Sequence, residues 1–132
     1  MKLPTLRNEG LILRPIEERD LDALVEIVSA PGVSEWWGFV ESEEKLRADL
    51  LSDGDAFAVE VDGEISGWLG VWEEDEPEFR HGGVDIMLAP DRQGRGIGPR
   101  ALRMAVDWLI DECGHHRVTI DPAVGNDRAI RA

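Results

Sequence analysis

The chain has 132 residues, 42% of them hydrophobic, which is the size of one compact domain with a substantial core, so we expect residues 1–132 to form a single domain. Its formal net charge of −14 argues against nucleic acid as a partner, because phosphate backbones are bound by basic surfaces. No stretch approaches about 18 consecutive apolar residues, and the first residues contain no apolar run, so we expect no membrane partner and a cytoplasmic location. One cysteine, Cys113, excludes an internal disulfide, and its place on a predicted apolar helix stripe indicates a core residue.

Charge is distributed unevenly along the chain. Residues 1–90 hold 7 basic and 22 acidic side chains, a net charge of −15, whereas residues 91–132 hold 7 and 6, a net charge of +1. If the second part binds an anion, the first can present an acidic wall to a cation. Acidic surface that serves only solubility is the alternative.

The first elements expected are a strand and a helix. Leu11–Leu13 reads as a short strand that ends at Pro15, and Asp20 reads as the N-cap of the helix that follows. One buried face is predicted for this helix at Leu21, Leu24, Val25 and Val28, and Pro31-Gly32 ends it. Trp36 and Trp37 follow in a loop, where one of them lines a pocket or both pack over the core edge.

A second short helix and a hairpin come next. Ser42 caps the helix, which has apolar positions at Leu46, Leu50 and Leu51 and ends at residues 52–54. Asp62-Gly63 is the two-residue type I′ turn signal between strands 55–61 and 64–72. Period-2 alternation predicts Ile65, Leu69 and Val71 on one strand face and Trp68 and Trp72 on the other, which is covered or faces a ligand. Residues 73–78 are expected to be a solvated acidic loop.

A strand over 84–89 leads through a glycine loop into the clearest helix of the sequence, residues 99–113, which Gly114 ends. Glycines at 94, 96 and 98 let the backbone approach a ligand, Pro99 suits the first helical residue, and the helix N-terminus favours an anion. Arginine side chains add positive charge at Arg92, Arg95, Arg100 and Arg103. The loop is a candidate phosphate site, with a ligand-free turn as the alternative. Residues 117–121 are expected to form a parallel strand, and Asn126 begins a last helix.

Two common phosphate loops fit less well. A P-loop needs a Gly-Lys pair, which the chain lacks. Residues 96–101 match G-x-G-x-x-A, and Asp121 lies near the acidic position of a dinucleotide site. However, six residues separate the strand from Gly96 and only 11 follow Asp121, too few for the rest of a doubly wound sheet, so this fold is the runner-up.

The motif Q-x-x-G-x-G at residues 93–98, together with the order of elements, resembles the GCN5-related N-acetyltransferase (GNAT) family. This resemblance implies a mixed α/β sheet, the GNAT acyl-CoA N-acyltransferase fold. Within the family, residues 35–38, 72–85 and 119–126 are most similar to aminoglycoside 6′-N-acetyltransferases. Similar segments occur in acyltransferases of siderophore assembly, so the implied reaction is transfer of acetyl to a primary amine, with an aminoglycoside, a siderophore precursor, another small amine or a protein as acceptor.

The resemblance also implies roles for individual residues. Acetyl-CoA, the co-substrate, would be held at its pyrophosphate by the loop residues Gln93, Gly94, Arg95, Gly96 and Gly98. The backbone near Met87 and Leu88 would polarise the thioester carbonyl, and Asn126 would hold the pantetheine arm. Asp85 would receive the proton of the amine, directly or through water, or would only orient the substrate. A small polycationic amine would be bound by Trp36, Trp37, Asp85 and Asp121. No metal is expected.

One departure from the family concerns the general acid. The usual acid is a tyrosine in the last helix, expected beyond Ala132, and this sequence contains no tyrosine. We therefore expect a fold that is incomplete at its C-terminus, with the last helix cut and an unpaired sheet edge through which copies of the chain could associate. A CoA-binding module without catalytic activity is the alternative to an enzyme.

Overall fold

A computed structural model describes residues 3–30, 42–52, 55–74, 76, 81–115 and 118–120. The elements in chain order are β1 (Leu6–Asn8), β2 (Leu11–Pro15), the 3-10 turn η1 (Glu18–Asp20), α1 (Leu21–Ser29), α3 (Glu43–Ser52), β3 (Asp55–Val61), β4 (Glu64–Glu74), β5 (His81–Leu88), the 3-10 turn η2 (Pro90–Arg92), α4 (Ile97–Asp111) and β6 (Val118–Ile120). The strands form one sheet in the order β1-β2-β3-β4-β5-β6, antiparallel except for the parallel pair β5 and β6. The mixed sheet and the parallel last pair are as predicted.

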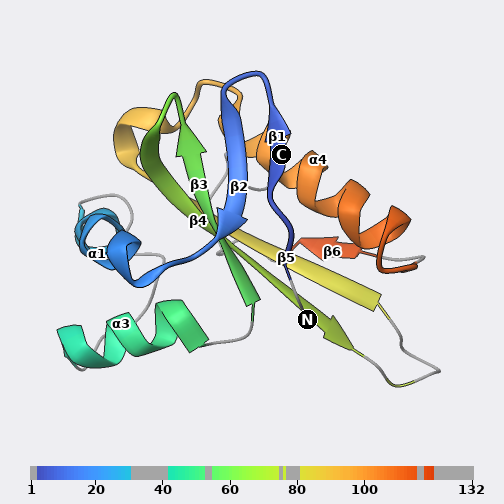
Figure 1. The fold of residues 1–132 in the computed structure, drawn as a ribbon, viewed down its shortest axis with the longest axis horizontal. Coiled ribbons are helices and arrows are strands. Elements are labelled where there is room, and N and C mark those ends of the chain that lie inside the picture. The colour runs from blue at the N-terminus through green and yellow to red at the C-terminus, as the bar shows by residue number, and fades with distance from the viewer. Residues whose placement is uncertain are drawn as a thin grey trace.

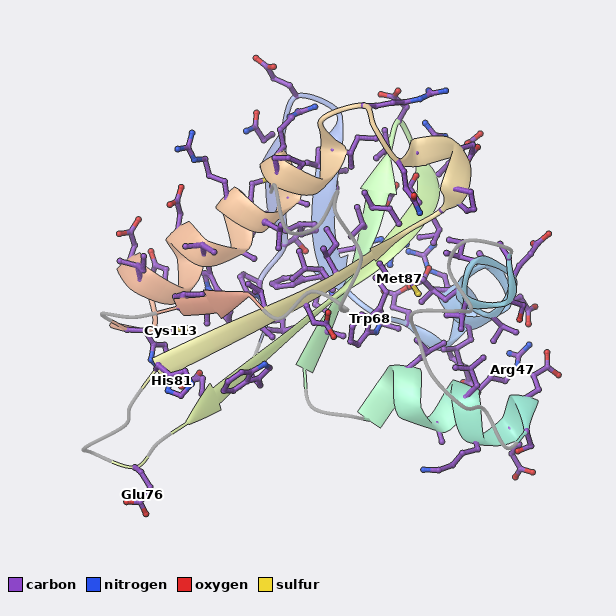
Figure 2. All side chains as sticks on the ribbon, turned by 180° about the vertical axis from the view of Figure 1, so that it is seen from behind. Arg47, Trp68, Glu76, His81, Met87 and Cys113 are labelled. Atoms are coloured by element: carbon purple, nitrogen blue, oxygen red, sulfur yellow. The ribbon has the colours of Figure 1, made fainter. Side chains whose placement is uncertain are left out.

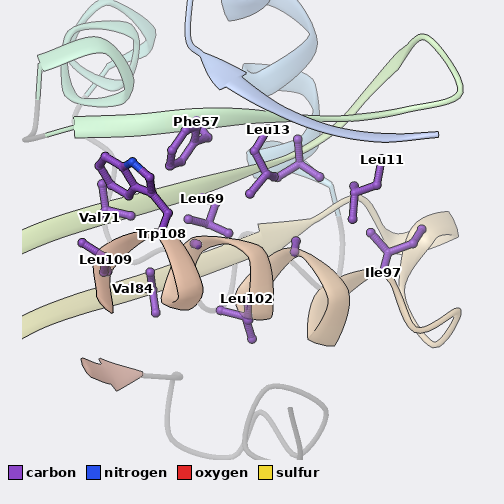
Figure 3. Packing of buried hydrophobic residues seen from close by; sticks show 13 residues of the cluster. Leu11, Leu13, Phe57, Leu69, Val71, Val84, Ile97, Leu102, Trp108 and Leu109 are labelled. Atoms are coloured by element: carbon purple, nitrogen blue, oxygen red, sulfur yellow. The ribbon is translucent and has the colours of Figure 1, made fainter. Parts of the chain in front are cut away.

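Helices cover both faces of this sheet, with α4 on one face and α1 and α3 on the other (Figure 1). Side chains of α4 pack against β2 to β5, and the edge of the Trp108 ring meets Phe57 with centroids 5.9 Å apart (Figure 3). A second cluster joins α1 and α3 to Trp68 of β4. Figure 2 shows Trp68 and Met87, from neighbouring strands, on the side of the sheet that α1 and α3 cover.

The β3–β4 hairpin has the predicted turn, because φ is 51° at Asp62 and 85° at Gly63, as a type I′ turn requires. The predicted face of Ile65 is wrong. Glu60 pairs with Ile65 but Val59 pairs with Gly67, so one additional residue bulges out of β4 between them. A bulge reverses the alternation beyond it, and Ile65 therefore packs on the Trp68 face, away from Leu69 and Val71.

Strand β4 is longer than predicted. Glu73 pairs with Gly82 and Glu74 with His81, so these two residues belong to the sheet and not to the acidic loop. Of the rest of that loop, Glu76 is described and is exposed. Backbone groups make the cross-strand pairs with β5, so two acidic residues can belong to the strand.

Near the N-terminus the structure adds β1, which the sequence did not predict, and changes the role of Asp20. This residue precedes α1, but its carboxylate makes no capping bond to that helix. It accepts hydrogen bonds from both terminal nitrogens of Arg14, each at 2.8 Å, and from the Glu17 N–H. Burial alone would raise the pKa of Asp20, but these hydrogen bonds outweigh it and hold the pKa below its usual value.

The other predicted helix features are mostly confirmed. Ser42 caps α3, since its Oγ accepts the N–H of Lys45 at 3.1 Å. In α1 the buried stripe includes Ile27, whereas Val25 is only half-buried. The residues expected to end α1, Pro31 and Gly32, lie outside the described residues.

Helix α4 begins at Ile97, two residues earlier than predicted, which puts Pro99 at the third helical position. That position still lies in the first turn, where a missing N–H costs no helical hydrogen bond. Trp108 is buried and Ile110 is 44% exposed, because the sheet lies toward the Ala105–Leu109 side of the helix. Gly114 ends the helix with φ of 74°, as predicted.

Candidate functional site

The loop between β5 and α4 has the conformation that a ligand-binding glycine loop requires. Gly94 and Gly96 have φ of 75° and 78°, in the left-handed region that favours glycine. A Cβ built on Gly96 would meet no atom within 4 Å, so this backbone borders open space at the N-terminus of α4. Gly98 is already helical, and a Cβ there would lie 3.6 Å from Leu88 Cδ1. Exposed backbone at the start of a 15-residue helix suits a phosphate group.

Of the four arginines predicted to add charge here, two hold the loop in place. Arg92 donates to the Glu64 carboxylate at 2.7 Å and so ties η2 to the β3–β4 hairpin. Arg100 donates to the Asn8 carbonyl at 2.9 Å and so ties α4 to the β1–β2 turn. Arg95 and Arg103 are exposed on the loop and on α4. Arg92 and Arg100 therefore hold the loop in position, whereas Arg95 and Arg103 face solvent.

Gln93 connects the loop with the end of the preceding strand. Its side-chain Nε2 donates to the Leu88 carbonyl at 3.1 Å. The loop glycines and the half-buried residues Met87 and Leu88 are thereby held next to each other.

Among the described residues, strand β5 pairs with β6 over only part of its length. On its β6 side the ladder joins residues 82–84 to 118–120 and ends at Val84 in the described part of the chain. Met87 and Leu88 lie beyond that point, and their ladder pairs are with Trp68 and Gly67 of β4. A strand edge with free backbone groups can pair with an extended ligand.

Asp85 follows Val84, the last β5 residue of the described ladder with β6, and is exposed on the face that carries Trp68 and Trp72. Its cross-strand partner is Gly70, and a Cβ there would overlap the ring of Trp68. Gly83 precedes it on the same face, and a Cβ there would overlap the indole of Trp72. The Asp85 carboxylate thus lies on a strand face where two indoles cover the neighbouring glycines.

Trp72 is the residue that the predicted site omitted. It is 42% exposed, and its ring meets the His81 ring edge-on with centroids 5.1 Å apart. The sequence signal was the pair of tryptophans on one strand face, of which Trp68 is buried under α3 with its Nε1 3.5 Å from the Leu50 carbonyl. Trp72 pairs with Gly83, whereas Trp68 pairs with Met87. The sequence alone does not give these cross-strand pairs, so it does not show which of the two indoles is exposed.

The remaining predicted site residues lie outside the described residues. These are Trp36, Trp37, Asp121 and Asn126. The structure brings together Asp85, Met87, Leu88, Gln93 and the loop glycines, along one strand and the loop after it. In the described ranges no helix is long and apolar enough to cross a membrane, and no three His, Cys, Asp or Glu side chains gather as metal ligands.

A mixed sheet with a parallel last strand pair, followed by a glycine loop at a helix N-terminus, is the arrangement expected of a GNAT acetyltransferase. The chain belongs to the acetyltransferase (GNAT) domain family, which it matches over residues 10–132. It is 29% identical to aminoglycoside N(6′)-acetyltransferase type 1 of Klebsiella pneumoniae, over 96% of this chain and 73% of that protein. It is 26% identical to spermidine N(1)-acetyltransferase of Escherichia coli, over 89% of this chain and 67% of that protein.

Solved structures agree with this assignment of the fold. The structure of AAC(6′)-Ib in complex with ribostamycin and coenzyme A superposes with a TM-score of 0.79 at 24% identity, over 93% of this chain and 79% of that chain. The predicted fold class, the family and the enzyme class of N-acetyltransferase are confirmed. Acetyl-CoA is the acetyl donor of GNAT acetyltransferases, so the predicted co-substrate is confirmed with the family.

Proposed function

We propose that this acetyltransferase acts on a primary amine of a small polycation, in the first place the 6′-amine of an aminoglycoside. The observation that carries the proposal is the position of Asp85, exposed on β5 two residues before Met87 and Leu88, which precede the glycine loop. The net charge of −15 over residues 1–90 favours a cationic acceptor, and the aminoglycoside acetyltransferase of Klebsiella pneumoniae supports this choice. Antibiotic resistance would be the consequence.

Acetyl-CoA would supply an activated acetyl thioester. Its pyrophosphate would be held by Gln93, Gly94, Arg95, Gly96 and Gly98, and Asn126 would hold the pantetheine arm. The open backbone at Gly96 fits this role, because a phosphate can approach the amides without meeting a side chain. The backbone at Met87 and Leu88 would polarise the thioester carbonyl, which favours negative charge on its oxygen as the amine adds.

The amine must be neutral when it reacts. Its nitrogen forms a bond to the acetyl carbon while the carbon–sulfur bond breaks, the nitrogen loses one proton, and the departing sulfur takes one up. Asp85 would accept the proton from nitrogen, directly or through water. Trp36, Trp37 and Asp121 would bind the other ammonium groups, and the exposed indole of Trp72 extends the same surface next to Asp85.

A linear polyamine is the second candidate acceptor, because the chain also matches spermidine N(1)-acetyltransferase of Escherichia coli. Both candidates are polycations and both fit the acidic half, so charge alone does not separate them.

Acetylation of an amine panel tests the proposal. Acetyl-CoA would be incubated with an aminoglycoside that has a free 6′-amine, a matched aminoglycoside with a hydroxyl at that position, spermidine, and buffer. Mass spectrometry should show one added acetyl group on the first compound and none on the second. Acetylation of spermidine alone would move the assignment to polyamines, and no acetylation of any amine would refute the proposal.

A further inference from the structure

A buried histidine contacts an acidic strand residue on the face of the sheet opposite Asp85. His115 is 1% exposed, and its Nε2 lies 3.1 Å from Oε2 of Glu73. The contact is not a hydrogen bond, because neither ring nitrogen has a hydrogen-bond partner among the described residues. The backbone N–H of His115 donates to the Leu109 carbonyl at 3.1 Å, which fixes the residue at the end of α4.

The end of β4 pairs with one neighbouring strand only, among the described residues. Its ladder with β3 ends at Val71, so residues 72–74 pair with β5 alone in the described sheet. Their partners are Gly83, Gly82 and His81, and the two glycines contribute no side chains. Gly82 instead leaves the space that Leu109 and His115 occupy, since a Cβ there would lie 3.2 Å from Leu109 Cδ1 and 3.4 Å from His115 Cδ2.

Glu73 and Trp72 are neighbours on the strand and therefore point to opposite faces. Glu73 faces α4 and His115, whereas Trp72 lies over Gly83 on the face of Asp85. A shift of this strand end moves both side chains together, because they share one segment of backbone.

We propose that Glu73 and His115 form a positioning pair that, through the end of β4, holds the indole of Trp72 next to Asp85 on the other face of the sheet. This inference rests on the proposed function for its effect on catalysis, but the coupling itself is a property of the fold. Removing the contact lets the strand end shift, and the surface that receives the amine shifts with it. Neither residue is expected to touch the substrate.

Two variants each change one partner of the contact. Glu73→Gln removes the negative charge with little change of volume, and His115→Phe removes both ring nitrogens and keeps a planar ring, although phenylalanine is the larger residue. Thermal unfolding of each variant separates a loss of stability from a shift of Trp72. Asp111→Asn, an exposed carboxylate on α4, is the matched control for loss of a negative charge. Trp72→Phe removes the indole that the pair is proposed to position, and it serves to assign the NMR signal of that indole.

The first readout does not depend on activity. Indole N–H signals of the tryptophans would be recorded by 15N-correlated NMR, and the signal of Trp72 assigned from its loss in Trp72→Phe. Both variants should shift or broaden that signal and leave the signal of Trp68 in place, and Asp111→Asn should change neither. An unmoved Trp72 signal would overturn the coupling.

The second readout is steady-state kinetics with the acetylated amine of the panel. Both variants should raise KM for the amine by about 3- to 10-fold, leave KM for acetyl-CoA and kcat near wild type, and have no further effect in a Trp72→Phe background. A purely structural role would lower kcat through a smaller folded fraction and leave KM for the amine unchanged, which would overturn the positioning role. Absence of any acetylation would refute the proposed function, and the NMR result would still decide the coupling.

Discussion

The indole of Trp72 occupies the space above Gly83 that a side chain at position 83 would need. The two residues are directly paired between β4 and β5, so the overlap is fixed by strand register and cannot be relieved by a loop movement. Glycine at 83 is therefore a requirement of the indole's position, and Asp85 follows two residues later on the same face.

Gly83→Ala should displace the Trp72 indole and raise KM for the amine. Overpacking of this kind costs about 1–3 kcal/mol, of which part should appear as lower stability. Gly83→Ala in a Trp72→Ala background is the control, because the added methyl group then meets no indole. Steady-state kinetics and thermal unfolding of the variants test this, and an equal rise of KM on adding Gly83→Ala to the wild type and to Trp72→Ala would contradict it.

Gly98→Ala should separate cofactor binding from stability. The residue is helical and its Cβ would make only an ordinary contact with Leu88, so alanine should stabilise the helix by up to about 1 kcal/mol. If the backbone here approaches the pyrophosphate, the same methyl group should weaken CoA binding. Calorimetric titration with CoA and thermal unfolding should therefore move in opposite directions.

Gly96→Val should weaken CoA binding more strongly, because φ of 78° disfavours a branched residue in addition to the blocked approach. Arg103→Ala removes one exposed charge from α4 and is the control. Equal losses of affinity in the glycine variants and in Arg103→Ala would refute the loop as the pyrophosphate site.

The elements were largely predictable because their signals are local. The Asp62-Gly63 turn, the Ser42 cap and the Gly114 stop each depend on a few adjacent residues. The face of Ile65 was not predictable, because the bulge that reverses it arises where β3 and β4 pair. Asp20 was mistaken for a helix cap because the sequence does not show that Arg14, six residues earlier, takes both carboxylate oxygens.

The site was predictable where it follows one strand and its loop. The sequence predicted the glycine conformations and the adjacency of Met87, Leu88 and Gln93, which the structure confirms as geometry. The exposed indole of Trp72 and the buried contact of His115 with Glu73 depend on cross-strand pairs and on the end of α4. Such contacts join residues far apart in the chain, so no local pattern reports them.

Asp85→Asn should distinguish a proton acceptor from an orienting carboxylate. A general base contributes about 100- to 10,000-fold, so loss of the base should lower kcat by that order with little change in KM for the amine. An orienting carboxylate should instead raise KM for the amine and leave kcat near wild type. A general base also predicts that kcat of the wild type falls at low pH and that this fall disappears in the variant.

Asp20→Asn should remove a stability contribution that depends on pH. Because hydrogen bonds hold the pKa of Asp20 below its usual value, the ionised carboxylate stabilises the fold fully above the unfolded pKa, and this stability is lost as pH falls from there through the lower pKa of the folded state. The variant should lose about 3 kcal/mol near pH 7, since the largely buried Arg14 keeps only Glu60 as a partner, and less near pH 3. Urea unfolding at several pH values tests this. Asp22→Asn, in the exposed pair with Arg47, should cost below about 1 kcal/mol at any pH.

Attraction of the acceptor should depend on salt if the acidic half of the chain forms its binding wall. Exposed charges interact over about 10 Å at 0.1 M salt and over about 30 Å at 0.01 M, so a polycation should bind much more weakly at physiological ionic strength than at low salt. A monoamine of similar size carries one charge and should bind weakly at both. KM for the aminoglycoside, for spermidine and for the monoamine would be measured across this range, with KM for acetyl-CoA as the internal reference.

A steep rise of KM with salt for both polycations would support the wall formed by residues 1–90, whose net charge is −15. A steep rise for only one would show that the positions of the carboxylates, Asp85 among them, select the acceptor by geometry as well as by charge. A flat response for all three amines would contradict the electrostatic argument and favour a less charged acceptor.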